Sequence, residues 1–491
     1  MPSVSEIDRA AQDNIVRGVL YPEVPDMTTI QNHLPTAELQ ALDAAHHMHP
    51  FTHGDALAKK GARVITSAKG VFLKDSDGVE ILDGMSGLWC VNLGYGRSEL
   101  AEVAARQMRE LPYYNTFFQT TTVPALSLAA RIAELAPEGL DHVFFSSSGS
   151  EANDTNIRLV RHYWHAMGKP SKKIIISRKN GYHGSTMGGA SLGGMSAMHA
   201  QGGLPIPDIT HIDQPHWWAE GGDTSPEEFG LARARQLEDK IAELGEDNVA
   251  AFIAEPIQGA GGVIIPPETY WPEIQRICDA HDILLIADEV ICGFGRTGEW
   301  FGCQAMNIRP DIMTFAKGVT SGYQPVGGSI VHKDVAAVVN AAGDFNHGYT
   351  YSGHPVACAV ALENVRLLDE EGVLQHVRDI AAPALAEKFA TLGEHPMVAD
   401  PRTFGMLGGL QLSPDKDARA KFEAPVGTIG LRVRERCFAN GVIMRHVGDR
   451  MIVCPPLVIT PEEIDAMVER ALKSIDEAYE GAKADGLFKS A

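Results

Sequence analysis

Two residues of opposite charge, Asp288 and Lys317, each stand where a short apolar run ends. The runs cover residues 283–287 and 312–316, and such runs are typical of strands buried on both faces of a parallel sheet. Ligands of open α/β sheets bind outside the carboxyl ends of the strands, so both side chains are placed to meet one ligand. A lysine that forms a Schiff base and an acid that pairs with a protonated ring nitrogen are what pyridoxal 5'-phosphate (PLP) requires. An isolated Lys and Asp would instead indicate strand-end charges that face water.

A junction rich in serine and glycine, SSSGSEAND, follows a predicted strand at residues 141–145 and opens a predicted long helix. Ser148, Gly149 and Ser150 would lie at the helix N-terminus, where unpaired N–H groups and the helix dipole favour a phosphate. Ordinary N-capping by a serine is the alternative. Three serines and a glycine exceed what a cap needs, so we expect a phosphate site.

Two further strand ends carry polar groups. Tyr182 and His183 stand between glycines in NGYHG, after a predicted strand at residues 173–177, and a tyrosine there can lie flat on an aromatic ring. Glu255 follows the apolar run 249–254. This second carboxylate could orient a catalytic water or a tyrosine, or it could merely cap the next turn.

Three residues outside the strand ends are candidates for binding a ligand. Trp89, in the loop GLWCVNLGYG, could line a pocket or belong to the core. Thr350, between two tyrosines, could donate its hydroxyl to a phosphate. Arg445, at the end of GVIMR, could bind a carboxylate through two hydrogen bonds, or form a surface ion pair.

Two other motifs point to different chemistry. Residues 293–298, GFGRTG, match the G-x-G-x-x-G spacing of a nicotinamide-dinucleotide site. That fingerprint should open a helix directly in the first βα unit, so we interpret this match as a tight active-site loop. The segment HHMHPFTH holds His46, His47, His49 and His53, but their spacing suits no single helix face. We expect capping or packing there and no metal site.

The composition excludes several classes of protein. The 491 residues carry a net charge of −21 with no block of Lys and Arg and no basic helix-turn-helix pattern, so we expect no nucleic-acid or membrane partner. The seven scattered cysteines include no C-x-x-C pair, which favours reduced thiols. No signal-peptide h-region or apolar run of eighteen residues occurs, so we expect a cytoplasmic protein.

The order of predicted elements indicates an α/β protein, with a mostly parallel sheet flanked by helices and a smaller α+β domain. We expect a polar arm over residues 1–45 and the N-terminal part of the small domain over 46–85. That part contains a hairpin with its turn at Asp77-Gly78. The large cofactor-binding domain would cover residues 86–350 and the C-terminal small domain residues 351–491.

Taken together, the motifs resemble a known family. SGSEAND, NGYHG, AEPIQG, ADEVICGFGRTG, FAKG and TYSGHP occur in the order seen in class III aminotransferases, which are PLP enzymes of fold type I. GLWCVNLGYGR, LPIPDITHI and IMRHVGD resemble the omega-amine:pyruvate branch, and most of all its putrescine (polyamine):pyruvate enzymes. The resemblance covers residues 46–475.

This resemblance implies a role for each candidate in binding the cofactor. Lys317 would carry PLP as a Schiff base, and Asp288 would pair with its pyridine nitrogen. The phosphate would be received by Gly149 and Ser150, beside Ser147 where the family often has Asn or Gly. Tyr182 would stack on the ring. Further cofactor contacts are implied for Ser148, His183, Glu255 and Val290.

The resemblance also implies partners and a reaction. Thr350 would reach the phosphate of a neighbouring subunit, which predicts a homodimer and leaves a tetramer open. Arg445 would bind the carboxylate of the keto acid and swing aside for a plain amine, and Trp89 would line the substrate pocket. The expected reaction moves the amino group of a primary omega-amine, such as a putrescine-like diamine, to pyruvate, with Lys317 as acid and base. Alternatives are a β-alanine or taurine:pyruvate aminotransferase, or a PLP aminomutase that needs no added keto acid.

Overall fold

The structure is a computed structural model that describes residues 34–488. Contacts divide the chain into two units, Met1–Thr66 with Lys74–Val79, and Ser67–Leu73 with Glu80–Ala491. Most of the expected N-terminal arm lies outside the described residues. Its described end forms helix α2 (Thr36–His46), which the sequence did not predict. All residues of the predicted site belong to the second, larger unit.

The smaller unit contains α2, α3 (Gly54–Lys60) and the turn of the expected hairpin. In that turn the carboxylate of Asp75 accepts the N–H groups of Asp77 and Val79, at 3.1 and 2.9 Å. The turn joins strand β2 (Phe72–Asp75) to β3 (Glu80–Asp83), so the predicted hairpin at Asp77-Gly78 is confirmed.

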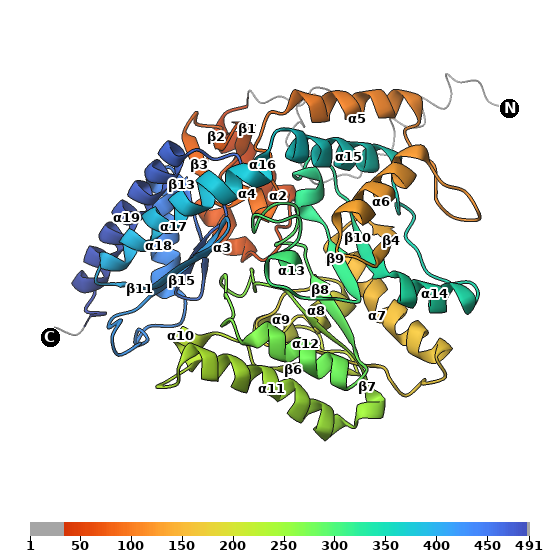
Figure 1. Cartoon of the computed structure of the whole chain (residues 1–491). Helices are drawn as coiled ribbons and strands as arrows, with labels where there is room; N and C mark the ends of the chain where they lie inside the picture. The colour runs from red at the N-terminus through yellow and green to blue at the C-terminus, as the bar shows by residue number, and fades with distance from the viewer. Residues whose placement is uncertain (1–33, 489–491) are drawn as a thin grey trace, which may run out of the picture. The chain divides into compact units, whose positions relative to one another are not determined.

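A seven-stranded sheet forms the centre of the larger unit (Figure 1). Strand β10 runs antiparallel to both of its neighbours, and the pairs among the other described strands are parallel. The predicted α/β fold with a mostly parallel sheet is therefore confirmed. In spatial order the strands are β4 (Leu140–Ser146), β10 (Gly327–His332), β9 (Ile312–Phe315), β8 (Leu284–Asp288), β7 (Val249–Ala254), β5 (Ile174–Arg178) and β6 (Ile209–Ile212).

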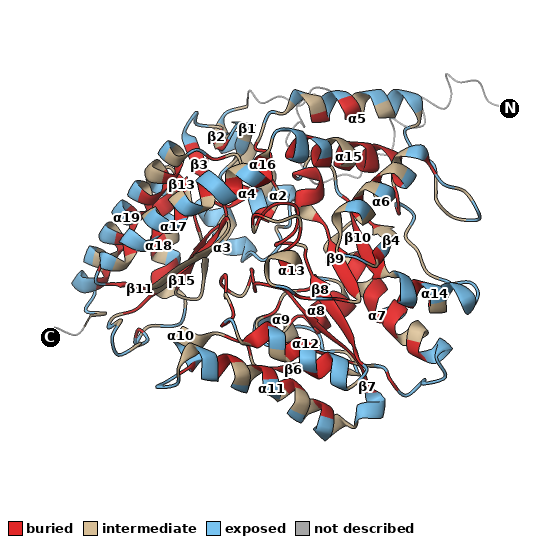
Figure 2. Ribbon diagram, viewed as in Figure 1, coloured by how far each residue is buried: buried red, intermediate tan, exposed pale blue. Residues whose placement is uncertain are grey.

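Both faces of this sheet are buried, as the continuous apolar runs predict (Figure 2). Along β7, Ala251 and Ile253 pack in a cluster with α7 (Gly149–Ala166) and α14 (Lys333–Ala341). Phe252 and Ala254 point to the opposite face and join the core of α6 (Val123–Leu135), α11 (Pro226–Leu244) and α12 (Tyr270–Ala280). This alternation fixes the sheet between two layers of helices.

A second, antiparallel sheet follows in the chain, in the order β11 (Val398–Phe404), β12 (Leu407–Leu412), β15 (Arg450–Val453) and β14 (Arg445–Val447). Strands β11 and β12 form a hairpin. Before this sheet the chain forms α16 (Val373–His376), a π-helical turn η3 (Val377–Ala381) and α17 (Ala382–Thr391).

Two long helices accompany this sheet, α18 (Thr428–Ala439) and α19 (Pro461–Ala484). Thr460 and Glu463 form a capping box at the start of α19. A short strand, β13 (Val442–Ile443), pairs with β3 in a third sheet, of order β1 (Ile65–Lys69), β2, β3 and β13. None of the helices within residues 34–488 is long and apolar enough to cross a lipid bilayer.

The strand directions bring five loops together. Because β4, β5, β7, β8 and β9 point the same way, their carboxyl ends lie along one edge of the sheet. The residues that follow these ends are Ser148, Tyr182, Glu255, Asp288 at the last position of β8, and Lys317. The sheet thus places the predicted site residues at a single edge.

Candidate active site

Lys317 follows β9 directly and starts a short 3-10 turn, η2 (Lys317–Thr320). Its backbone has a φ of 47°, a left-handed conformation that is unusual for a residue other than glycine. The amine forms no hydrogen bond and no ion pair with the residues that the structure describes, and it lies 5.2 Å from the centre of the Trp89 ring. Burial lowers the pKa of this amine. A lysine with a lowered pKa and no partner fits a nucleophile toward an aldehyde.

Asp288 is 2% exposed and is oriented by three donors. Its Oδ2 accepts from Nδ1 of His183 at 2.7 Å and from Nδ2 of Asn153 at 2.8 Å. Its Oδ1 accepts the N–H of Val290 at 3.1 Å. These donors fix the orientation of the carboxylate, and a carboxylate is the group that pairs with a protonated ring nitrogen.

Asn153 is a site residue that the sequence analysis missed. It lies in the first turns of α7 and donates to both Asp288 and the carbonyl of His183, while its own oxygen accepts from Thr314 on β9 at 2.8 Å. The signal was present in the sequence, since Asn153 follows the phosphate motif by one helical turn and would face the sheet. Asn153 thereby ties helix α7 to the ends of β8 and β9.

The N-terminus of α7 combines a cap with free donors. Ser148 is the N-cap, since its hydroxyl accepts the N–H of Glu151 at 3.2 Å. The N–H groups of Gly149 and Ser150 have no partner among the described residues, and the Ser150 hydroxyl accepts the N–H of Ser185 at 3.1 Å. Both alternatives are therefore realised, a serine cap and two free N–H groups that fit a phosphate.

Val290 packs against this helix start. A Cβ built on Gly149 would lie 2.8 Å from Cγ2 of Val290, so only glycine leaves the present spacing. Val290 thus lies between Asp288 and the start of α7, and its expected contact with the cofactor stays a prediction.

Arg445 and Lys317 both lie beside the ring of Trp89. Trp89 is 2% exposed, and its ring has the Lys317 amine 5.2 Å away and the Arg445 guanidinium carbon 4.8 Å away. Arg445 makes no hydrogen bond or ion pair with any described residue, and burial lowers the pKa of its guanidinium. Tyr182 packs against the apolar cluster that contains Trp89. An unpaired guanidinium beside the same indole ring as the lysine is available to a carboxylate ligand.

Thr350 does not join the site within its own chain. It is exposed, and its carbonyl accepts from the hydroxyl of Tyr113 at 2.7 Å. No contact among the described residues links it to Gly149, Ser150 or Lys317. Its expected role across a subunit interface stays a prediction.

The GFGRTG segment is a loop and opens no helix. The next helix, α13, begins only at Gly302. Arg296 in this loop is fully buried and donates to Oδ1 of Asn92 at 2.8 Å, to the hydroxyl of Ser86 at 3.2 Å and to the carbonyl of Pro455. The segment ties distant parts of the larger unit together, which a dinucleotide fingerprint does not do.

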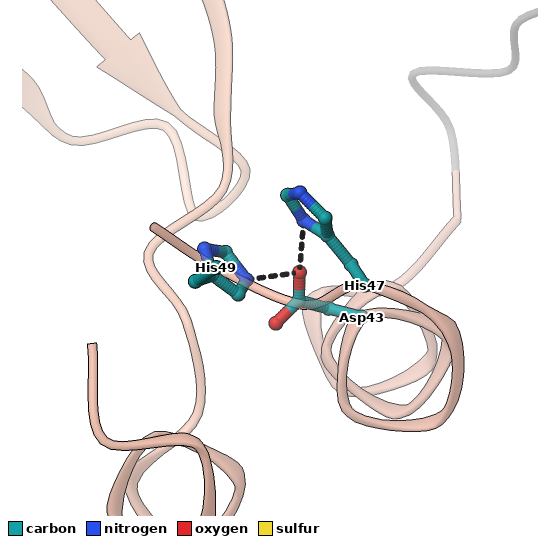
Figure 3. A group of neighbouring side chains, drawn as sticks. All are labelled: Asp43, His47 and His49. Carbon is teal, nitrogen blue, oxygen red and sulfur yellow. Dashed lines mark hydrogen bonds and ion pairs between the residues drawn. The ribbon is translucent and has the colours of Figure 1, made fainter. Parts of the chain in front are cut away.

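The histidine-rich segment belongs to the smaller unit (Figure 3). Asp43 accepts from Nδ1 of His47 at 3.1 Å and from Nε2 of His49 at 2.7 Å, and His53 caps α3 by accepting the N–H of Ala56. The expected capping and packing roles are therefore observed. The possible ligand atoms of Asp43, His47 and His49 also lie within 4.8 Å of one another, and the sequence analysis had not included Asp43. The mutual hydrogen bonds already account for this arrangement.

The residues at the sheet edge fit PLP. The unpartnered Lys317 amine fits the aldehyde, the buried Asp288 fits the ring nitrogen, and the free N–H groups at the start of α7 fit the phosphate. The structure brings these three sets together with Tyr182, His183, Val290 and Trp89, and it places Arg445 beside the ring of Trp89.

Comparisons with known proteins agree with this chemistry. Residues 56–475 match the family model of class-III aminotransferases. A putrescine–pyruvate aminotransferase of Pseudomonas aeruginosa is 58% identical over 442 residues, which cover 90% of this chain and 96% of that protein. A diaminobutyrate–2-oxoglutarate transaminase of Halomonas elongata is 40% identical over 95% of this chain and its own full length.

Solved structures give the same result. The omega transaminase of Pseudomonas jessenii in complex with PMP superposes with a TM-score of 0.88 at 38% identity and covers 91% of this chain and 99% of its own. A thermostable (S)-enantioselective omega-transaminase of Thermomicrobium roseum has a TM-score of 0.88 at 41% identity, with the same coverage.

Proposed function

Because the chain belongs to the class-III aminotransferases, a PLP-dependent family, we propose that it moves the amino group of a primary omega-amine to pyruvate. A putrescine-like diamine is the proposed donor, and the products are alanine and an aldehyde or ketone. The 58% identical relative is named for putrescine and pyruvate, which supports this choice of donor and acceptor.

One observation carries the proposal: the Lys317 amine and the Arg445 guanidinium both lie beside the ring of Trp89. A small 2-keto acid has its carbonyl and its carboxylate on neighbouring carbons. It needs one amine and one cation a short distance apart, and Lys317 and Arg445 lie 5.2 and 4.8 Å from the same indole ring. The absence of a partner for Arg445 among the described residues supports a carboxylate ligand there.

The site residues then have distinct tasks. Bound PLP supplies an electron sink for the reacting carbon. Lys317 takes and returns the proton at that carbon, a role that its lowered pKa favours. Asp288, held by His183 and Asn153, keeps the ring nitrogen protonated. The start of α7 binds the phosphate, and Trp89 and Tyr182 limit the space around Lys317.

β-Alanine and taurine remain the alternative donors. Each carries an acidic group that would compete for Arg445, whereas a diamine carries none, so the two classes of donor should differ in their need for Arg445. An aminomutase would turn over without an added keto acid.

We further propose a homodimer in the cytoplasm, with Thr350 acting across the interface and a tetramer left open. Exposed aromatic side chains near Thr350 support the interface: Tyr114 is 50% exposed, Phe118 92% and Tyr351 60%. The seven cysteines are all free thiols, which supports a reducing compartment. A native mass of a single chain would contradict the dimer.

The test of the function is turnover of putrescine with pyruvate, followed as alanine formed, in the wild-type enzyme and in Arg445→Ala. Loss of a charge-assisted contact of about 1.5–3 kcal/mol should raise the KM for pyruvate about 10- to 100-fold. The reaction with putrescine in the absence of pyruvate should change little. Arg434→Ala, which removes a neighbouring charge on α18, is the matched control. No alanine, or an unchanged KM for pyruvate in Arg445→Ala, would contradict the proposal.

A further inference from the structure

Four buried charged side chains lie in a row behind the cofactor site. We propose that charges alternate along this row, from Arg178 through Glu255 and His183 to Asp288. Glu255 holds a second proton on His183, so His183 is a cation where it meets Asp288. Glu255 and Arg178 are then positioning residues that act on Asp288 through His183. The catalytic meaning of this row rests on the function proposed above, whereas the charge of His183 does not.

His183 has one satisfied and one unsatisfied nitrogen. Its Nδ1 lies 2.7 Å from Oδ2 of Asp288. Its Nε2 is buried and has no hydrogen-bond partner among the described residues, and the residue is 2% exposed. A buried nitrogen without a partner is rare, so something on that side must interact with it.

Glu255 supplies the missing group. Its Oε1 accepts the N–H of Gly259 at 3.2 Å, whereas its Oε2 is buried and has no hydrogen-bond partner within residues 34–488. A Cβ built on Gly181 would lie 3.4 Å from His183 Nε2 and 3.5 Å from Glu255 Oε2. The two unsatisfied atoms therefore face the same small volume beside Gly181. One water molecule in that volume would let a proton on Nε2 of His183 interact with the carboxylate of Glu255.

Arg178 lies on the other side of Glu255. Its Nη2 donates to the carbonyl oxygen of Glu255 at 2.5 Å and lies 3.9 Å from Oε2. The guanidinium also lies over the rings of Tyr270 and Trp271, at 5.7 and 5.5 Å. Its side chain is 1% exposed, so its charge needs a partner inside the protein, and the carboxylate of Glu255 is that partner.

The groups around Glu255 favour its charged form above neutral pH. Burial raises the pKa of Glu255 to about 7, the positive His183 and Arg178 oppose this, and the charge of Asp288 adds to it. The thiol of Cys292 is also near and stays neutral, because burial holds its pKa well above the usual range. With Glu255 charged, two anions and two cations alternate among these four side chains.

The consequence concerns Asp288. An imidazolium donates a stronger hydrogen bond than a neutral imidazole, so it holds the carboxylate of Asp288 in its charged form. That charged form is the one that pairs with a protonated cofactor ring. Glu255 thereby controls, through His183, the carboxylate of Asp288 that faces the cofactor.

Neutron diffraction from deuterium-exchanged crystals of the holoenzyme at pH 8 tests this directly, because it shows each deuterium. We expect deuterium on both Nδ1 and Nε2 of His183. In Glu255→Gln, the deuterium on Nε2 should fall from near full to near zero occupancy.

Glu289→Gln is the matched control. Glu289 is also fully buried, and burial raises its pKa to about 7, but its two oxygens accept the N–H groups of Gly302 and Cys303 at 2.7 and 2.6 Å. His183 should keep both deuterium atoms in that variant. A neutral His183 in the wild-type crystal, or retention of both atoms in Glu255→Gln, would overturn the proposal.

The wild-type result is decisive even if the variant does not fold. The proton positions are also independent of which amine is the substrate. A failure of the putrescine reaction would therefore leave this result unchanged, and the two proposals can fail separately.

Discussion

At the scale of single residues, the orientation of Asp288 depends on its neighbours. Inside the sheet edge it has His183, Asn153 and the backbone of Val290 as donors, and its own removal would leave these donors facing an empty space. Breaking one partner of a buried charge pair costs about 3–5 kcal/mol. The carboxylate is therefore as important to the local structure as to the cofactor.

Asp288→Ala should lose both cofactor affinity and turnover. We expect the Kd for PLP to rise about 10²- to 10³-fold, because the partner of the ring nitrogen is lost and His183 becomes unpaired. Titration of the apoenzyme with PLP, followed by visible absorbance, measures this. Asp288→Asn keeps the shape of the side chain but not its charge, and so separates the contribution of the charge from that of the shape. Tightly held PLP with undiminished turnover in Asp288→Ala would refute the role of Asp288.

The residues that could be predicted are those fixed by a local rule. Asp288, Lys317 and the serines before α7 each follow an apolar strand, and strand ends of a parallel sheet meet at one edge. Helical spacing places Asn153 one turn after the phosphate motif, but it does not give the partners of Asn153 on other elements. The Trp89–Arg445 contact follows no local rule, because it joins segments far apart in the chain.

At the scale of elements, the approach of Val290 to the start of α7 positions the phosphate donors. Gly149 is the first residue of α7, and alanine there would favour the helix by about 1 kcal/mol. The added methyl group would, however, lie 2.8 Å from Cγ2 of Val290. The helix start and the end of β8 would then have to move apart.

Gly149→Ala should therefore weaken PLP binding without lowering thermal stability by a similar amount. Overpacking of about 1–3 kcal/mol corresponds to a rise of about 10- to 100-fold in the Kd for PLP. Val290→Ala removes the colliding methyl groups, so the double variant should recover most of the affinity. Equal affinity in Gly149→Ala and the wild type, or no recovery in the double variant, would contradict this account.

Elements with a regular pattern of apolar or capping residues were predicted, whereas elements that depend on partners far away in the chain were not. The buried strands β7 and β8 and the capped helix α19 follow directly from the sequence. The antiparallel direction of β10 could not be predicted, because both directions bury the same apolar residues. The π-helical turn η3 ends two residues before Pro383, and a proline, which lacks an N–H, is a local signal for an interruption of the helix there.

At the scale of the whole molecule, the site depends on the C-terminal part of the chain. The predicted boundaries, with a large domain over residues 86–350 and a small one over 351–491, stay a proposal. Arg445 lies beyond residue 350, on β14, yet it contacts the same indole ring as Lys317. Any motion between these two parts would change the distance between the lysine and the cation that we assign to the keto acid.

The central claim is that a vitamin B6 aldehyde is bound covalently to one lysine at the edge of this sheet. Reduction of the purified enzyme with borohydride, followed by digestion and mass spectrometry, tests it most directly. We predict loss of the visible absorbance band and one modified peptide, with the added mass on Lys317, and no such peptide from Lys317→Arg. A modification on another lysine, or none after incubation with PLP, would contradict the account.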